Sequence, residues 1–354
     1  MISEDKGVAS SVAPPSLDLN IVCGAGGTRS VLACTGSVLA CHFAGISRFN
    51  LIGGASGGAI PTVLLAGGVH PVQIAHLTVE TDFSSLLDRR CFLTPRLPYM
   101  LRHPLYHIFR PRQGFYGSER VGQFIEQYVP TWPKNYWTVA VVGESEWLFT
   151  ADGVFQYQYD GSRRRLSDQP APVGLAVRAT SAIPFVFQAI PYLGTYLSDG
   201  GLSFDGRTPV RTVERHFGTK AESIVAVDLG DNLLGLPAFL RPLLNLLWPL
   251  LCGPHCPLEG KTPLGSEGTI LIQPNVTGVS SLEFSAPPDQ KWRPLMAGFV
   301  DALPVLEKAG LLGGSRLDEG RSITSDYQKI VASSSRDGEL ATRTATLMAS
   351  HGLY

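Results

Sequence analysis

The sequence places one serine in a pattern that is typical of hydrolase nucleophiles. Gly54, Ser56 and Gly58 form Gly-x-Ser-x-Gly, with an apolar run directly before the motif and another directly after it. This context predicts a nucleophile elbow, the sharp turn between a strand and a helix that displays a reactive serine. Glycines suit such a turn because they lack a Cβ and readily adopt positive φ angles. Ser56 is therefore the candidate nucleophile.

Two other glycine-rich segments could complete a site around this serine. Residues 24–29, Gly-Ala-Gly-Gly-Thr-Arg, precede a long apolar helical run, and free backbone N–H groups at a helix start bind negative charge such as an oxyanion. A dinucleotide fingerprint does not fit, because Gly-x-Gly-x-x-Gly needs glycine where Arg29 stands. Asp199 ends a short predicted strand before Gly200 and Gly201. Taken alone, such an aspartate is most often a turn residue.

The elements that must hold these residues are strands interspersed with helices. Short apolar runs predict buried strands, and longer apolar or amphipathic runs predict helices. This order favours an α/β fold with a sheet covered on both faces. The predicted strands are 17–23, 137–142, 147–150, 154–157, 196–199, 224–229 and 269–272, and the predicted helices are 30–45, 59–66, 71–81, 172–181 and a helical tail from 295.

Composition limits the class of protein. The chain has 354 residues, and 44% of them are hydrophobic, which is enough for a sizeable core. A formal net charge of -1 gives no global electrostatic reason to expect nucleic acid as a partner. The six cysteines lack the spacing of a zinc site, and no signal peptide opens the sequence, so we expect reduced thiols in a cytoplasmic protein without a metal.

Three segments stand apart from this core pattern. Residues 1–16 have the composition of a flexible tail. Residues 84–116 interleave arginines with aromatic residues, which suits either a lipid headgroup contact or a solvated helical cap. Residues 233–251 are rich in leucine, but three prolines argue against a transmembrane helix. A lid, a surface patch on a membrane and a buried arm all remain open for that segment.

Four blocks of the chain, in order, resemble the patatin-like phospholipase family. The resemblance is dense from about residue 17 to residue 230 and absent beyond it. The two departures are Ala25, at a position that is often glycine, and Ser30, where a glycine commonly follows the basic residue. The blocks are the glycine-rich loop 24–29, the elbow 54–58, Ala179-Thr180-Ser181-Ala182-Ile183-Pro184, and Ser198-Asp199-Gly200-Gly201 with Thr208-Pro209-Val210 beyond.

This resemblance implies a three-layer α/β/α patatin fold with a central, mostly parallel sheet and the elbow after an early strand. It implies lipid acyl-ester hydrolysis without a cofactor, by Ser56 as nucleophile and Asp199 as its only catalytic partner. Burial of Asp199 beside an acyl site would raise its pKa and make it a useful base. The implied oxyanion donors are Gly26, Gly27 and Thr28, and Arg29 would steady the loop or a lipid headgroup.

The resemblance also divides the chain and sets its expected surroundings. We expect a tail over 1–16, a catalytic core over 17–230 that carries 84–116 as an insertion, and a C-terminal extension over 231–354 packed on the core. The expected partner is a membrane lipid or another acyl lipid. The protein would contact membranes peripherally and would bind no nucleic acid.

Two alternatives stay open at this point. The first is a Ser-acid-His triad in the chain order of α/β-hydrolases, with Ser56, then Asp228 or Asp231, then His255. The second is a lipid-binding or scaffolding module with a silent site. Every catalytic position is filled, which argues against the second alternative.

Overall fold

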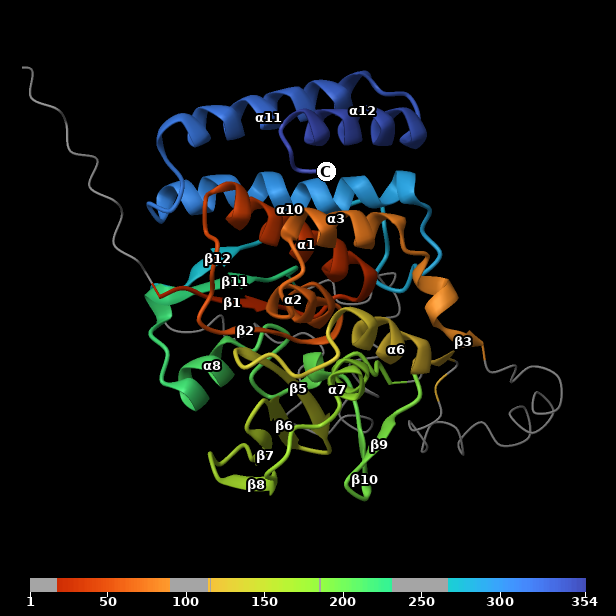
Figure 1. Ribbon diagram of the computed structural model, residues 1–354, viewed down its shortest axis with the longest axis vertical. Coiled ribbons are helices and arrows are strands. Elements are labelled where there is room, and N and C mark those ends of the chain that lie inside the picture. The colour runs from red at the N-terminus through yellow and green to blue at the C-terminus, as the bar shows by residue number, and fades with distance from the viewer. Residues whose placement is uncertain (1–17, 90–113, 115, 185, 231–266) are drawn as a thin grey trace, which may run out of the picture.

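A computed structural model describes residues 18–89, 114, 116–184, 186–230 and 267–354 of the chain (Figure 1). Its centre is an eight-stranded sheet with the strand order β12-β11-β1-β2-β5-β6-β7-β8. The strands of this sheet are β1 (Asn20–Cys23), β2 (Ile52–Gly54), β5 (Tyr136–Val142), β6 (Ser145–Thr150), β7 (Gly153–Tyr157), β8 (Arg163–Ser167), β11 (Ile224–Val227) and β12 (Ile270–Ile272).

The half of the sheet that carries the serine motif is parallel. Strands β12, β11, β1, β2 and β5 pair in parallel, whereas β5 to β8 form an antiparallel meander. Cys23 pairs with Gly54, so the ends of β1 and β2 lie side by side. Parallel strands bring the loops that follow them to one edge of the sheet, which is where α/β proteins place their sites.

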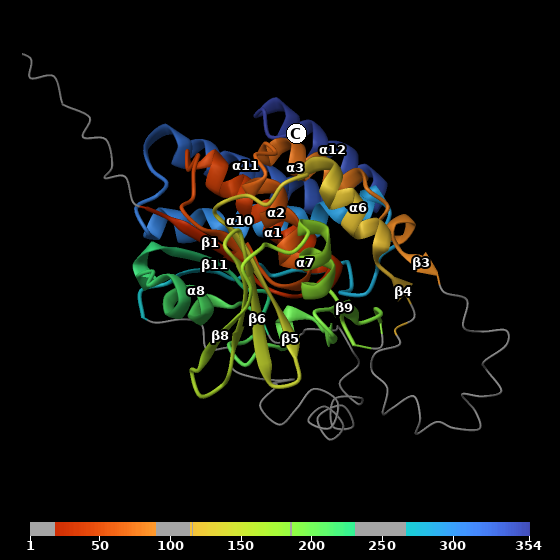
Figure 2. The same cartoon turned by 60° about the horizontal axis from the view of Figure 1, so that its bottom comes forward.

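Helices lie on both faces of the sheet (Figures 1 and 2). In Figure 1, α10, α11 and α12 form the top of the molecule, with α1 and α3 between them and the sheet, and α8 lies on the opposite side. The helices are α1 (Gly27–Phe43), α2 (Ala59–Ala66), α3 (Pro71–Glu80), α6 (Glu119–Tyr128), α7 (Val173–Thr180), α8 (Val210–Phe217), α10 (Pro288–Lys308), α11 (Gly314–Ser333) and α12 (Asp337–Ser350).

Successive side chains of β1 and β11 point alternately into two separate hydrophobic cores, one on each face of the sheet. Ile21 and Val225 face a core shared with α1 and α10, whereas Val22 and Ala226 face a core shared with α8. Successive side chains of a strand point to opposite faces, so this split follows from the apolar runs of the sequence. The predicted three-layer α/β/α fold with a mostly parallel sheet is confirmed.

Helix α1 lies at the centre of the molecule, as suits its long apolar run, and it packs most extensively against α10. Glycines allow the contact: a Cβ on Gly36 would lie 1.9 Å from the Leu295 carbonyl oxygen, and one on Gly298 would lie 1.9 Å from the Ala33 carbonyl oxygen. The Ser37 hydroxyl also donates to the Gly298 carbonyl at 3.1 Å. The C-terminal helices therefore pack directly on the first helix of the predicted core.

Several elements differ from the sequence prediction. Helix α2 begins and ends at the predicted residues, but the amphipathic helices α6 and α8 were not predicted. Strand β8 was missed because its sequence, Arg-Arg-Arg-Leu-Ser, is exposed and charged, as suits an edge strand. The hairpin of β3 (Asp88–Arg89) with β4 (Tyr116–Gly117) was also missed. In the second hairpin, β10 (Thr195–Leu197) overlaps the predicted strand 196–199, whereas its partner β9 (Ile190–Tyr192) was not predicted.

Some predictions fall on parts of the chain that the structure does not describe. The tail 1–16, most of the arginine-aromatic segment 84–116 and the leucine-rich segment 233–251 lie outside the described residues. Strands β3 and β4 pair at the two ends of the 84–116 segment. Among the described helices, none is both long and apolar enough to cross a bilayer. The domain boundaries at 16/17 and 230/231 stay predictions.

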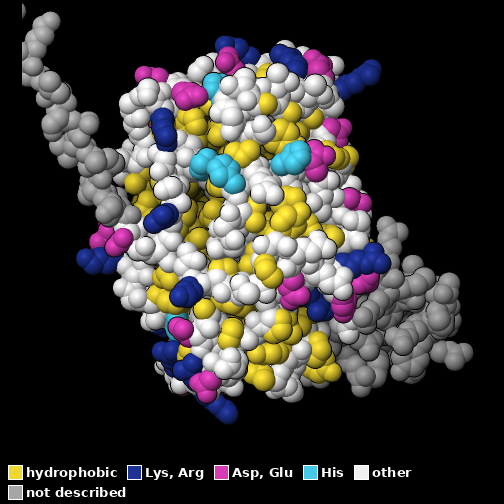
Figure 3. All heavy atoms as spheres, in the orientation of Figure 1, with side chains coloured by type: hydrophobic (Ala, Val, Ile, Leu, Met, Phe, Trp, Pro, Cys, Tyr) yellow, Lys and Arg dark blue, Asp and Glu magenta, His cyan; other side chains and the backbone are white. Residues whose placement is uncertain are grey.

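On the face shown in Figure 3, basic and acidic side chains are interspersed. The described part of this face has no extended patch of a single charge sign, in keeping with the net charge of -1. The site must therefore be sought in local geometry rather than in a global field.

The contact between α1 and α10 predicts a stability effect. Gly298→Ala should lower the free energy of unfolding by about 2 kcal/mol, because the new methyl group overlaps a backbone carbonyl that cannot move freely. Urea unfolding midpoints would measure the loss. Gly313→Ala is the matched control, since a Cβ there meets no atom within 4 Å. Equal stabilities of the two variants would contradict the close approach of α1 and α10.

Candidate active site

Ser56 occupies the predicted elbow between β2 and α2. It begins a 3₁₀ turn over Ser56–Gly58, has a φ of 53° and is 2% exposed. A positive φ is unfavourable for a residue with a side chain and persists only where surrounding contacts hold it. Here the Ser56 N–H donates to Thr180 Oγ1 at 3.0 Å, and the Ser181 hydroxyl donates to the Ser56 carbonyl at 3.2 Å. The block 179–184 therefore holds the nucleophile elbow in place.

The glycines around Ser56 are required by crowding. A Cβ on Gly54 would lie 2.7 Å from the Gly58 carbonyl oxygen, and one on Gly58 would lie 2.5 Å from the Gly24 carbonyl oxygen. A Cβ on Gly57 would lie 2.2 Å from the Gly27 carbonyl oxygen. The elbow and the glycine-rich loop after β1 are thus in direct backbone contact. A side chain at Gly57 or Gly58 would push the elbow and this loop apart, and one at Gly54 would distort the elbow itself.

Asp199 lies in hydrogen-bond contact with Ser56. The Ser56 hydroxyl donates to Asp199 Oδ2 at 2.7 Å, although 143 residues separate the two in sequence. The Gly201 N–H donates to the other carboxylate oxygen, Oδ1, at 2.7 Å. Asp199 is 4% exposed, and its own N–H donates to the Ala182 carbonyl at 3.0 Å. The carboxylate is therefore held in one orientation, toward the serine.

Burial raises the pKa of Asp199 to about 7, while the hydrogen bonds from Ser56 and Gly201 oppose the rise. A carboxyl group with a pKa near neutrality is a far better proton acceptor for a hydroxyl than one near 4. The shift also has a cost, because the folded state binds more protons than the unfolded state between about pH 4 and pH 7. The contribution of Asp199 to stability therefore falls as pH rises through that window.

The loop after Asp199 is anchored by buried polar contacts. The Ser203 hydroxyl donates to Glu146 on β6, and the Thr208 hydroxyl donates to Asp228 Oδ1 at 2.8 Å. Arg207 forms an ion pair with the same Asp228 carboxylate at 4.0 Å. These contacts join the loop to β6 and β11 and so limit the movement of Asp199.

The glycine-rich loop contains candidate oxyanion donors. Gly26 and Gly27 have φ angles of 155° and 58°, which only glycine adopts without strain. Among the described residues, neither of their N–H groups has a hydrogen-bond partner. The Thr28 N–H, in contrast, donates to the Ser281 carbonyl at 3.0 Å. The N–H groups of Gly26 and Gly27 are therefore the candidate oxyanion donors of this loop. The N–H group of Thr28, the predicted third donor, is already used in its hydrogen bond to Ser281.

Arg29 follows this loop and contacts the C-terminal region. Its guanidinium donates to the Val276 carbonyl at 3.1 Å, and burial lowers its pKa. This contact fits the predicted role of Arg29 in steadying the loop. It joins the start of α1 to the segment that follows β12.

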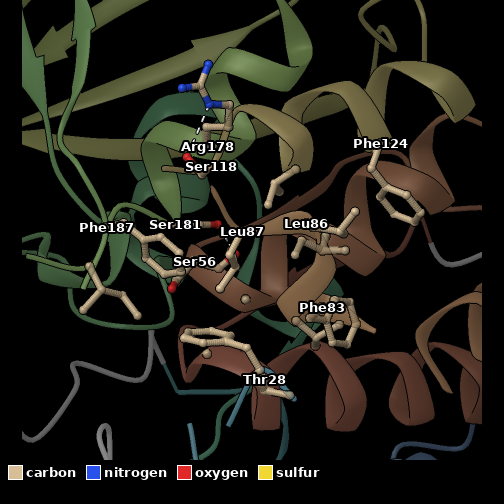
Figure 4. A pocket seen from close by; sticks show the side chains of 17 residues that line it. Thr28, Ser56, Phe83, Leu86, Leu87, Ser118, Phe124, Arg178, Ser181 and Phe187 are labelled. Carbon is tan, nitrogen blue, oxygen red and sulfur yellow. Dashed lines mark hydrogen bonds between the residues drawn. The ribbon is translucent and has the colours of Figure 1, made fainter. Parts of the chain in front are cut away.

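An apolar cavity opens beside Ser56 (Figure 4). Its empty space, with its open mouth included, is about 660 Å³. In Figure 4, Ser56, Ser181 and Phe187 lie at one end, whereas Phe83, Leu86 and Phe124 lie toward the other. The remaining lining residues are Gly27, Thr28, Val31, Gly57, Ile60, Leu87, Ser118, Val121, Arg178, Ile183 and Phe284. This lining suits a hydrocarbon chain whose polar end lies at the serine.

The alternative triad receives no support from Asp228. Its carboxylate accepts hydrogen bonds from Thr208 and Gln273 and pairs with Arg207, so it serves the fold around β11. Asp231 and His255 lie outside the described residues. Among the residues that line the described cavity, none is a histidine.

Sequence reasoning missed the residues that support the elbow from a distance. Thr180 and Ser181 lie in a block that resembled the family, but nothing in the sequence assigned them a hydrogen bond to Ser56. The contacts from Val276 and Ser281 carry no sequence signal, because both use backbone carbonyls. The described residues contain no group of three acidic, histidine or cysteine side chains placed to hold a metal. Cys23, Cys34 and Cys41 are buried free thiols.

The fold and this site define an α/β protein with a serine-aspartate pair beside an apolar cavity. The patatin-like phospholipase family model matches residues 21–212, more than half of the chain, and the chain belongs to that family. The matched range contains Ser56, Asp199 and the glycine-rich loop. Family membership supports lipid acyl-ester hydrolysis and lipid substrates at the level of the family.

Two solved structures are similar to the chain. VipD from Legionella pneumophila is 13% identical with a TM-score of 0.46, and the match covers 89% of this chain and 75% of VipD. The type III effector protein ExoU is 12% identical with a TM-score of 0.41, and the match covers 97% of this chain and 70% of ExoU. No curated protein matches the sequence.

The pKa of Asp199 predicts how the reactivity of Ser56 depends on pH. Labelling of Ser56 by a fluorophosphonate probe should accelerate as pH rises through about 7, because only the ionised carboxylate accepts the serine proton. Gel fluorescence over pH 5 to 9 measures the rate, and Ser56→Ala gives the background. A labelling rate that does not change over this range would contradict the predicted role of Asp199 as the proton acceptor.

Proposed function

We propose that the protein is a lipid acyl hydrolase of the phospholipase A or lysophospholipase type, with Ser56 as nucleophile and Asp199 as general base. The observation that carries this proposal is the 2.7 Å hydrogen bond from Ser56 to a buried carboxylate at one end of an apolar cavity. Its position within the patatin-like phospholipase match supports the same assignment.

The reaction proceeds in two half-reactions. Ser56 Oγ attacks the ester carbonyl carbon while Asp199 Oδ2 takes the hydroxyl proton, and the protonated Asp199 then returns that proton to the departing alcohol. The acyl group is now esterified to Ser56. Asp199 next takes a proton from a water molecule that attacks this ester, and the proton returns to Ser56 Oγ as the fatty acid leaves. One residue thus acts as base and acid in each half-reaction.

The Gly26 and Gly27 N–H groups are the proposed donors to the oxyanion. Their neighbouring position at the start of α1 adds the positive end of a helix dipole. A donor of this kind is worth about 3 kcal/mol in the transition state. The acyl chain lies in the cavity along Leu86, Leu87 and Phe124, where it is removed from water.

The two candidate proton acceptors can be distinguished by substitution. Asp199→Asn should lower kcat on a p-nitrophenyl ester at least about a thousandfold, because the amide cannot accept the serine proton. His255→Ala should leave the rate nearly unchanged, since the dyad needs no histidine. Circular dichroism checks that both variants fold. Loss of activity in His255→Ala with activity retained in Asp199→Asn would establish the triad instead.

The substrate class needs a direct comparison of lipids. Release of fatty acid from phospholipid, lysophospholipid, glycolipid and neutral acylglycerol, each with Ser56→Ala as the control, would identify the ester that is cleaved. Product analysis in the presence of an acceptor alcohol separates hydrolysis from acyl transfer, which uses the same acyl-enzyme.

The leucine-rich segment 233–251 leads to a further prediction. If it contacts the bilayer, its deletion should reduce hydrolysis of lipids in vesicles about tenfold and hydrolysis of soluble short-chain esters by less than about twofold. Fatty-acid release from vesicles and p-nitrophenol release in solution measure the two rates. Equal losses on both substrates would mean that the segment is part of the core.

A further inference from the structure

Lys291 is a buried cation on α10 that the proposed chemistry does not use. Its side chain is 0% exposed, and its ammonium group donates to the Val79 carbonyl at 2.9 Å and to the Thr81 carbonyl. Those carbonyls belong to the C-terminal end of α3, the negative end of the helix dipole. Burial lowers the pKa of Lys291, and the nearby Asp82 and Glu80 oppose that shift.

The same ammonium group contacts the wall of the cavity. It lies 4.9 Å from the centre of the Phe83 ring, within the range of a cation–π interaction. Phe83 begins the short helix Phe83–Leu86, which supplies Phe83 and Leu86 to the cavity at the end away from Ser56 (Figure 4). The Asp82 carboxylate holds the start of this helix by accepting from the Ser84 N–H at 2.9 Å. Lys291 is thus a direct link between α10 and this wall.

Burial of an ammonium group costs free energy unless hydrogen bonds or opposite charges compensate for the lost hydration. A neutral side chain of similar length would fill the same space without desolvation of an ammonium group. The ammonium group adds directional contacts: it donates to two carbonyls at the end of α3 and faces the ring of Phe83. Together these contacts hold the end of α3 and the Phe83 ring beside α10. Lys291 lies outside residues 21–212, the range of the family match.

We propose that Lys291 is a positioning residue that holds Phe83 in the cavity wall and thereby sets the preference for long acyl chains. The effect is confined to the far end of the cavity, so the reaction at Ser56 proceeds normally with short esters. This inference rests on the proposed function, since it treats the cavity as the acyl site.

The test is a chain-length profile. In Lys291→Met, kcat/KM for a p-nitrophenyl dodecanoate should fall about tenfold, mainly through KM, whereas the value for the butyrate should change by less than about twofold. Lys308→Met is the matched control, because it makes the same change at the exposed end of the same helix. A purely structural role would reduce both esters alike, and an unchanged profile in folded Lys291→Met would overturn the proposal.

Substitution of Phe83 provides a second test of the same proposal. In a Phe83→Leu background, Lys291→Met should cause no further loss on the dodecanoate, because the ring through which the lysine acts is already gone. If Lys291→Met does not fold, Lys291→Arg replaces it: the charge remains, but the longer side chain displaces Phe83, and the same loss on the dodecanoate is expected. Full additivity with Phe83→Leu would contradict the proposed route.

A binding measurement separates this inference from the proposed function. In the Ser56→Ala background, a fluorescent long-chain fatty acid should bind about tenfold more weakly when Lys291→Met is added. If no ester is hydrolysed but this difference is found, the proposed function fails and the acyl site stands. If esters are hydrolysed and binding is the same with and without Lys291→Met, only the present inference fails.

Discussion

The candidate site depends most on a hydrogen bond between Ser56, which has a positive φ, and the buried carboxylate of Asp199. The Ser56 hydroxyl donates a hydrogen bond to Asp199 Oδ2, with 2.7 Å between the two oxygens, and Asp199 is only 4% exposed. Desolvation raises the pKa of the carboxyl group to about 7, which is the range that the proposed general base needs in the absence of a histidine. The proposed dyad therefore requires that the apolar surroundings of Asp199 keep water away from its carboxylate.

The parallel half of the sheet explains why residues distant in sequence meet. Strands β1 and β2 end side by side, so the loops that carry Gly27 and Ser56 touch through their backbones. Asp199 follows the end of β10, and the preceding residue, Ser198, pairs with Val141 on β5. Supports from Thr180 and Ser281 then hold the elbow and the loop. The site therefore forms where several strands end together, and no single loop contains all of its residues.

The sequence predicted those features that depend on local pattern. Apolar runs identified β1, α1 and α2, and glycine spacing identified Ser56, because turn geometry leaves a direct trace in residue type. The sequence did not predict helix α8, which has a short amphipathic pattern, or the contacts of Thr180 and Lys291, whose partners are more than 100 residues away. Such contacts form only when distant segments pack together, and the local periodicity of a sequence does not specify which segments meet.

The measurement that tests the central claim most directly is the location of a covalent adduct. Incubation of the folded protein with a long-chain alkyl fluorophosphonate, followed by peptide mass mapping, should give one adduct per chain on the peptide that contains Ser56. Because Asp199 is the proposed base, Asp199→Asn should reduce this adduct strongly without a change of position. An adduct on another residue, or none on folded protein, would contradict the assignment of Ser56 as the nucleophile.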